Sequence, residues 1–251
     1  MMAKKHENPW MASVLTLFPD TFPGILGASI IGTALKDEKW ALEAIDIRNF
    51  SYNKHRSVDA SPAGGGPGMV LTADVAARAI DSVARTPEGL ADPRPLIYVS
   101  PRGRPLTQKR VQAFSAGSGV IVFCGRFEGL DERVIEARQM EEVSIGDFVL
   151  AGGEIAAQAL IEACVRLLPG VLGDEASTVE ESFENGLLEY PLYAKPREWE
   201  ERKIPEVLLS GDHKRIANWR QAKSEEITRE RRPDIWQDYI KDKKEKNDEH
   251  N

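Results

Sequence analysis

Glycine-containing segments follow three apolar runs of the sequence. They read "YVSPRG" at 98–103, "CGRFEG" at 124–129 and "LAGGE" at 150–154. Glycine gives a turn its positive φ, or it lets another group approach the backbone where a side chain would collide. Backbone N–H and C=O groups left open in this way can bind a ligand, so the three segments together are a candidate ligand site.

A fourth glycine segment, "GGGPGM" at 64–69, suggests a phosphate-binding loop. It lacks the Gly-Lys-Ser/Thr of a P-loop, and no G-x-G-x-x-G opens a helix after a strand, which argues against a nucleoside triphosphatase or a dinucleotide-dependent dehydrogenase. The stretch before it, 48–66, contains Lys54, His55 and Arg56. This stretch is either a mobile surface loop or a basic lid over an anionic substrate.

The helix expected after "LAGGE" has two stripes at a spacing of four residues. The apolar stripe is Ile155, Ala159, Ala163 and Leu167, and the polar stripe is Gln158, Glu162 and Arg166. Arg166 is therefore predicted to point away from the core, either in a salt bridge with Glu162 or towards a functional site. The helix lies between a glycine-rich loop and the acidic "VEESF" at 179–183, and this position favours the functional role.

Short strand-like runs alternate with helical patterns through most of the chain. The runs lie at 13–18, 42–47, 95–100, 119–125 and 143–150, and the helical patterns at 72–86, 106–117 and 131–139. This alternation predicts an α/β domain with a mostly parallel sheet. Ligands of such sheets bind at the carboxyl ends of the strands. The three glycine segments fall at those ends.

The pattern changes after residue 173. A polar stretch, 174–186, is predicted to be a linker or a functional loop. Beyond Leu187 the sequence predicts one strand-like run, 207–211, and a long helix from a cap near Asp212 to about Arg231, ended by Pro233. The last eleven residues are predicted to be disordered.

Composition limits the possible functions. The formal net charge of −7 argues against non-specific coating of nucleic acid. Basic clusters at 213–215 and 229–232 suit either a selective anionic partner or a solvated helix face. No apolar stretch approaches the ~20 residues of a membrane helix. Cys124 and Cys164 lie in apolar runs without metal-ligand spacing, which predicts buried thiols and a reducing, cytoplasmic setting.

Six segments resemble bacterial tRNA (guanine-N1)-methyltransferases, which methylate guanosine 37 beside the anticodon and so prevent frameshifting. The segments are "YVSPRGRPL", "VFCGRFEGLDERV", "EEVSIGDFVLAGGE", "LLPGVLGDEAS", "EESFENGLLEYPLY" and "PEVLLSGDH". The resemblance runs in order from about Met11 to Trp219. It implies the SPOUT class of fold, an α/β parallel sheet with a deep trefoil knot, joined to a small, mainly helical C-terminal domain. It also implies S-adenosylmethionine as methyl donor, a Mg²⁺ requirement, tRNA as partner, and a homodimer with its active site at the subunit interface.

The same resemblance divides the chain and assigns the cofactor site. It implies an N-terminal extension at 1–10, the knotted methyltransferase domain at 11–169, an interdomain linker at 170–186, a helical tRNA-binding domain at 187–240, and a tail at 241–251. The implied cofactor contacts are Tyr98, Val99, Ser100, Pro101, Gly125, Glu128, Gly129, Ser144, Ile145, Gly146, Leu150, Gly152 and Gly153.

Two residues carry the implied chemistry. Glu181 would be the general base for guanine N1, and Arg166 would balance negative charge on guanine O6. The implied substrate contacts are Lys54, His55, Arg56, Asp59, Lys214 and Arg215. The family has aspartate where this chain has Glu181, and many members have tyrosine at Phe127 and Phe148 and a second aspartate at Ala60. A catalytically impaired, knotted RNA-binding homodimer and an enzyme for another anionic small molecule are the alternatives.

Overall fold

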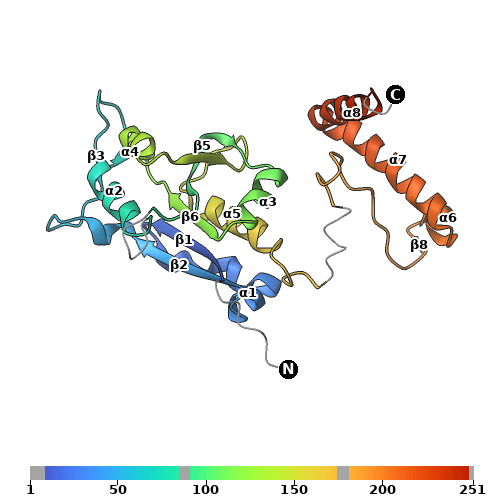
Figure 1. The fold of residues 1–251 in the computed structure, drawn as a ribbon, viewed down its shortest axis with the longest axis horizontal. Coiled ribbons are helices and arrows are strands. Elements are labelled where there is room, and N and C mark those ends of the chain that lie inside the picture. The colour runs from blue at the N-terminus through green and yellow to red at the C-terminus, as the bar shows by residue number, and fades with distance from the viewer. Residues whose placement is uncertain (1–8, 85–90, 174–180, 249–251) are drawn as a thin grey trace. The chain divides into compact units, whose positions relative to one another are not determined.

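The computed structural model describes residues 9–84, 91–173 and 181–248, and the chain forms two compact units, 1–173 and 174–251. The first unit is built on a five-stranded sheet in the order β2-β1-β6-β5-β7, in which every pair of neighbouring strands is parallel (Figure 1). Its strands are β1 (Trp10–Thr16), β2 (Trp40–Asp46), β5 (Leu96–Pro105), β6 (Gly119–Cys124) and β7 (Glu141–Ser144). The predicted α/β domain with a mostly parallel sheet is thus confirmed for the described residues.

Helices cover both faces of this sheet. They are α1 (Ser29–Lys36), α2 (Ala73–Asp81), α3 (Gln108–Ser115), α4 (Glu132–Ala137) and α5 (Glu154–Val165), with short 3-10 turns η1 (Pro19–Thr21), η2 (Gly24–Gly27) and η3 (Ile47–Phe50). Successive strand residues point to opposite faces. Val122 therefore joins the core with α1, α3 and α5, whereas Phe123 joins the core with α2, α4 and η3. A sheet covered on both faces explains why its strands read as nearly continuous apolar runs.

Several strand boundaries differ from those predicted, and two of the differences have a clear physical reason. β1 begins at Trp10, inside the predicted N-terminal extension, because Trp10 pairs with Trp40 and its indole N–H donates to the Phe114 carbonyl at 3.1 Å. The run 143–150 is not one strand, because β7 ends at Ser144. The Ser144 hydroxyl donates to the Gly146 carbonyl and accepts from the Gly146 N–H, and this local turn ends the ladder.

The predicted apolar stripe of α5 was wrong. The buried side of the helix consists of Glu154, Ala156, Ala157, Leu160, Ile161, Cys164 and Val165. Ile155 leads the predicted stripe, yet its side chain is 65% exposed. The helix is apolar on most of its circumference, so the spacing of four could not decide which side faces the sheet.

The segment 48–66 contains a turn and the first strand of a short hairpin. Asn53 to Arg56 form a turn in which the Arg56 N–H donates to the Asn53 carbonyl at 3.0 Å. Beyond it, β3 (Asp59–Ala60) and β4 (Val70–Leu71) make a short antiparallel hairpin whose connection contains "GGGPG". The hairpin is tied to the main sheet unit because the Leu71 N–H donates to the Gly129 carbonyl at 2.9 Å.

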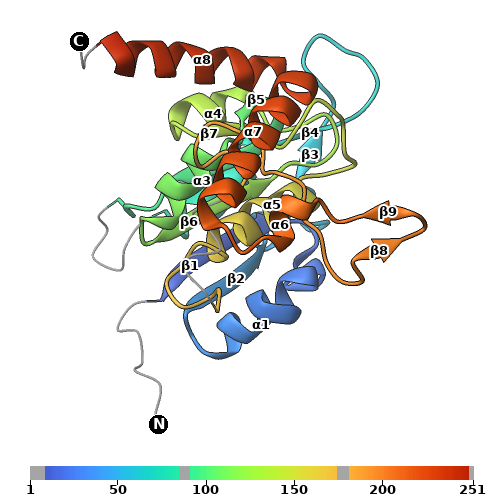
Figure 2. The same ribbon diagram turned by 90° about the vertical axis from the view of Figure 1, so that its right-hand side faces the viewer.

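The second unit is mainly helical in its described part. It contains a small hairpin, β8 (Glu198–Trp199) and β9 (Arg202–Lys203), followed by α6 (Glu206–Leu209), α7 (His213–Arg231) and α8 (Pro233–Asp248), as Figure 2 shows. Asp212 caps α7 by accepting from two backbone N–H groups, which confirms the predicted start, and Pro233 opens the next helix.

Two predictions for this unit were wrong. Most of the strand-like run 207–211 lies in α6, since Pro205 favours a helical start and no strand of the described residues pairs with it. The tail predicted to be disordered from Lys241 is instead helical as far as Asp248. The α8 helix is held by α7, where the Tyr239 hydroxyl and the Lys243 ammonium both donate to Glu225.

Candidate functional site

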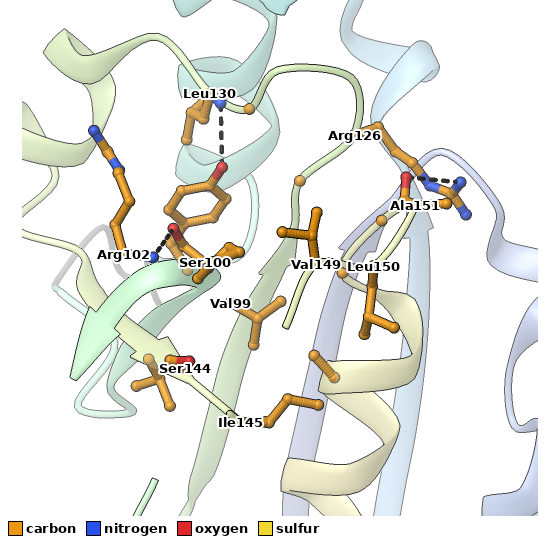
Figure 3. Close-up of a pocket in the computed structure, with 18 of the residues that line it drawn as sticks. Val99, Ser100, Arg102, Arg126, Leu130, Ser144, Ile145, Val149, Leu150 and Ala151 are labelled. Atoms are coloured by element: carbon orange, nitrogen blue, oxygen red, sulfur yellow. Dashed lines mark hydrogen bonds between the residues drawn. The ribbon is translucent and has the colours of Figure 1, made fainter. Parts of the chain in front are cut away.

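A cavity of about 360 Å³ opens at the carboxyl ends of β5, β6 and β7. Three loops form its walls: the bulge 100–103 within β5, the segment after β6, and the segment after β7 (Figure 3). All thirteen residues predicted as cofactor contacts lie in its lining: Tyr98, Val99, Ser100, Pro101, Gly125, Glu128, Gly129, Ser144, Ile145, Gly146, Leu150, Gly152 and Gly153. The residues predicted from the sequence therefore line a single cavity, and this convergence does not by itself identify the ligand.

The first wall is fixed by Tyr98 and the bulge that follows it. The Leu130 N–H donates to the Tyr98 hydroxyl at 3.2 Å, which ties β5 to the loop after β6. Burial raises the pKa of Tyr98, so its hydroxyl stays neutral. Val143 on β7 pairs with both Val99 and Arg104, so residues 100–103 bulge out of the ladder, and the Arg102 N–H donates to the Ser100 hydroxyl.

The second wall, Gly125 to Leu130, is braced from behind by the β3–β4 hairpin. The Glu128 N–H donates to the Met69 carbonyl at 2.9 Å. The Glu128 carboxylate lies against Gly68, where any Cβ would collide with it and where φ is +88°. The "GGGPGM" segment thus supports the rim of the cavity through Glu128.

The third wall contains two glycines, Gly152 and Gly153, and protein atoms pack closely against both. A Cβ at Gly152 would collide with the Arg126 side chain. A Cβ at Gly153 would lie 2.7 Å from Val99 Cγ2 and 2.8 Å from Cys124 Cα. Gly153 must be glycine before any ligand is present, because the loop after β7 presses directly on β5 and the backbone after β6, whereas the Arg126 side chain beside Gly152 can shift.

A buried ion pair joins the second and third walls. Arg126 Nη2 lies 2.9 Å from Glu154 Oε2, and Thr16 at the end of β1 donates to Glu154 Oε1 at 2.7 Å. The Arg126 guanidinium also lies over the Phe18 ring, 4.3 Å from its centroid. Figure 3 shows the Arg126 side chain turned away from Val99 and Leu150 and out of the cavity. Sequence reasoning missed this pair, although Arg126 stands inside "CGRFEG" and Glu154 ends "LAGGE".

The cavity lining has one acid without a cationic partner in the described part of the chain. Arg126 is neutralised by Glu154, and Arg102 Nη2 lies 2.8 Å from Glu132 and 3.2 Å from Glu142. The hydrogen bond to Glu132 raises the pKa of Arg102. Glu128 is the remaining charged residue of the lining. The site therefore presents apolar walls, backbone groups and a carboxylate, a combination suited to a ligand that is partly aromatic and carries positive charge.

The two predicted catalytic residues lie in different units. Arg166 is the C-cap of α5 and is half-buried, in agreement with a position away from the core. Glu181 lies in the second unit, where it lines another cavity of about 570 Å³. Each is described within its own unit, so the structure does not bring them together. Glu180 lies outside the described residues.

The predicted substrate contacts are spread over both units. Lys54 and His55 are exposed on the turn 53–56, and Arg56 hydrogen-bonds to Asn49 there. Asp59 begins β3. Lys214 and Arg215 are exposed on the first turn of α7.

The described residues also show what the chain offers in metal ligands, thiols and long apolar helices. No group of three or more His, Cys, Asp or Glu side chains is placed to hold a metal ion. Cys124 and Cys164 are buried and free, as predicted, and burial raises the pKa of Cys164 to about 12. None of the described helices combines the length and the apolar character that crossing a membrane requires.

The fold and the cavity first define a class: an α/β protein with a ligand site at the carboxyl ends of parallel strands, walled by three glycine-containing loops. Within this class, the particular family is identified by sequence. Residues 11–238 match the family model described as tRNA (Guanine-1)-methyltransferase TrmD, and the chain belongs to this family.

Several relatives carry the name tRNA (guanine-N(1)-)-methyltransferase. The relative from Nitrobacter winogradskyi is 61% identical over 90% of this chain and 93% of its own length. The relative from Caulobacter vibrioides is 59% identical over 96% of both chains. A third, from Ruegeria pomeroyi, is 59% identical over 91% of this chain and 93% of its own. The resemblance noted in the sequence is thereby confirmed.

Proposed function

We propose that this chain methylates N1 of guanosine 37 in tRNA with S-adenosylmethionine as donor. The observation that carries the proposal is that thirteen residues, chosen from scattered segments, line one cavity in a chain of this family. A set of unrelated surface residues would not converge in this way. The names of the relatives state tRNA guanine-N1 methylation, and the proposal adds a specific tRNA position, a methyl donor and a set of residues.

The cavity fits S-adenosylmethionine by its chemistry. The side chains of Val99, Ile145 and Leu150 offer apolar surface for a purine ring, and the surrounding loops offer backbone groups for its edge (Figure 3). Glu128 offers a negative charge to the sulfonium and ammonium groups. When bound, this donor supplies a methyl group activated by positive sulfur.

The residues of the chain then have to handle one proton and one developing charge. Guanine N1 is a nucleophile only when its proton leaves, and the Glu181 carboxylate accepts that proton. Negative charge then develops on guanine O6, where the Arg166 guanidinium balances it. The resemblance places the two residues on opposite subunits of one site. Glutamate in place of the family's aspartate keeps the carboxylate and adds one methylene of reach.

Several features support the knotted fold and the homodimer that the SPOUT class implies. The Gly153 N–H donates to the Gly125 carbonyl at 2.9 Å and Gly152 pairs with Arg126, so the segment after β7 returns across β5 to the loop after β6. Such a crossing is what a knot requires. Ile155 on α5 and Ile25 on the neighbouring η2 are both about two-thirds exposed, and a second copy of the chain would cover them.

Substrate RNA would meet basic groups in both units. Lys54, His55 and Arg56 are exposed on the turn before β3, where Asp59 lies, and Lys214 and Arg215 offer phosphate contacts on α7. The resemblance also implies a Mg²⁺ requirement, and Mg²⁺ is commonly held by one or two carboxylates together with substrate phosphates.

Methyl transfer from tritiated S-adenosylmethionine to unmodified tRNA tests the proposal. We expect transfer to wild-type tRNA and none to tRNA with adenosine at position 37. Saturable binding of donor and tRNA without transfer would support the impaired RNA-binding homodimer. Absence of saturable donor binding in calorimetry would support an enzyme for a different anionic molecule.

A further inference from the structure

The second unit contains a cavity of its own, with a volume of about 570 Å³. One wall comes from the segment 181–190 and the other is the N-terminal part of α7, from His213 to Ser224. Glu181 belongs to the lining, but most of the other lining residues have no role in the donor site or in the proposed proton transfer. We therefore ask which ligand this cavity could bind.

A hydrogen bond joins the two walls, and further bonds order each wall. The Leu188 N–H donates to the Thr228 hydroxyl at 2.8 Å, and Thr228, fully buried, donates to the Ser224 carbonyl at 2.6 Å. Within the segment, the Glu189 N–H donates to the Ser182 hydroxyl at 3.0 Å. These bonds make the cavity a preformed site, so little ordering is needed when a ligand enters.

The lining combines flat surfaces with hydrogen-bonding groups. The Arg220 guanidinium lies over the Tyr190 ring, 4.7 Å from its centroid. The side-chain amides of Asn185 and Gln221 and the imidazole of His213 belong to the same lining. Aromatic rings and guanidinium planes stack on nucleobases, and amides bond to base edges, so this combination matches an unpaired nucleobase.

We propose that this cavity binds an unpaired base of the substrate RNA, next to the base that is methylated. The inference rests on the proposed function, because an unpaired target guanine has to enter the active site for N1 to meet the methyl donor, and this movement takes the base out of its stack. Its neighbour then loses a stacking partner and requires a new surface. Since Glu181 would meet the target and also lines this cavity, the base held here is within one nucleotide of the target.

Filling the cavity tests this directly. Ala217 lines the cavity from an exposed position on α7, so Ala217→Leu should occupy it without removing a native contact. Asn218 is the adjacent exposed residue outside the lining, and Asn218→Leu is the matched control. We expect Ala217→Leu and Tyr190→Ala to weaken binding of an anticodon stem–loop by ~10-fold, the scale of one stacked base, and the control to change it little.

Stem–loops that lack one base at a time identify the occupant. With the base that fills the cavity removed, Ala217→Leu should weaken binding no further, whereas every other abasic stem–loop should show the full loss. The inference would be overturned if Ala217→Leu bound the intact stem–loop normally, or if it lost the same affinity with every abasic stem–loop. It would also be overturned if Ala217→Leu changed the oligomeric state and left RNA binding unchanged. Because Ala217→Leu decides the outcome, a Tyr190→Ala variant that fails to fold does not matter. Methyl transfer by the wild-type protein tests the proposed function separately.

Discussion

At the scale of single residues, the glycines in and behind the cavity of the first unit are required for different physical reasons. Gly68, behind the cavity, has a positive φ, and this backbone conformation disfavours a side chain, whereas the Glu128 carboxylate beside it can move. Gly153 has an ordinary backbone conformation, and it is excluded only by contact with Val99 and Cys124. A glycine beside a ligand cavity can thus be required by the protein alone.

Gly153→Ala is therefore expected to lower stability as well as donor affinity. Its Cβ would force Val99 and the Cys124 backbone apart, and overpacking of this kind costs about 1–3 kcal/mol. Thermal unfolding and calorimetric titration with S-adenosylmethionine measure the two effects. Gly173→Ala is the control, because nothing lies within 4 Å of the added Cβ. A Gly153→Ala variant with unchanged Tm and weakened donor binding would contradict the packing argument.

Glu181→Gln is expected to reduce single-turnover methyl transfer by ~10²-fold or more, the usual scale of a general base, with donor and tRNA binding little changed. The amide keeps the size of the side chain and cannot take the proton. Glu181→Asp should keep most of the activity if the loop can adjust by one methylene, and Glu180→Gln should be nearly silent. The opposite pattern would move the base to Glu180, and small effects at both positions would mean that the proton leaves to water.

At the scale of elements, the sequence predicted what local patterns determine. The five strands, the cap at Asp212 and the cavity loops were located because apolar runs, cap residues and glycines are local signals. The buried side of α5 depends on what packs beside it, which no local spacing contains. The helix at 206–209 did have a local signal, Pro205 at its start, which the strand prediction overlooked. The Arg126–Glu154 pair joins residues 28 positions apart through a sheet, so only the folded structure places them together.

That pair is expected to behave asymmetrically on substitution. Glu154 is 4% exposed, so Arg126→Met leaves a buried carboxylate without its cation and should lower the free energy of unfolding by about 3 kcal/mol. The Arg126 side chain is 25% exposed, so Glu154→Gln leaves a cation that water can still solvate and should lower the free energy of unfolding by less. The Arg126→Met/Glu154→Met double variant should recover part of the loss. Urea unfolding measures all three, and equal losses for the two single variants would contradict a role for burial.

At the scale of the whole molecule, the residues of the proposed reaction are divided between two units. The cavity walled by the three glycine-containing loops and Arg166 belong to residues 1–173, and Glu181 belongs to residues 174–251. The proposed site therefore takes Arg166 and Glu181 either from one chain or from the two chains of a dimer. A site assembled from two subunits would be incomplete in a monomer, which would make dimerisation a condition of activity.

Mixed dimers distinguish these two arrangements. Arg166→Ala and Glu181→Gln should each be inactive alone. If the two residues act across the interface, a dimer with one copy of each variant has one site with both substitutions and one site with neither. Equal mixing with subunit exchange makes half of the dimers mixed, so about a quarter of the wild-type sites should be restored. Single-turnover transfer after co-refolding measures this, with each variant refolded alone as the control. If both residues act within one chain, every site carries one substitution and mixing restores nothing.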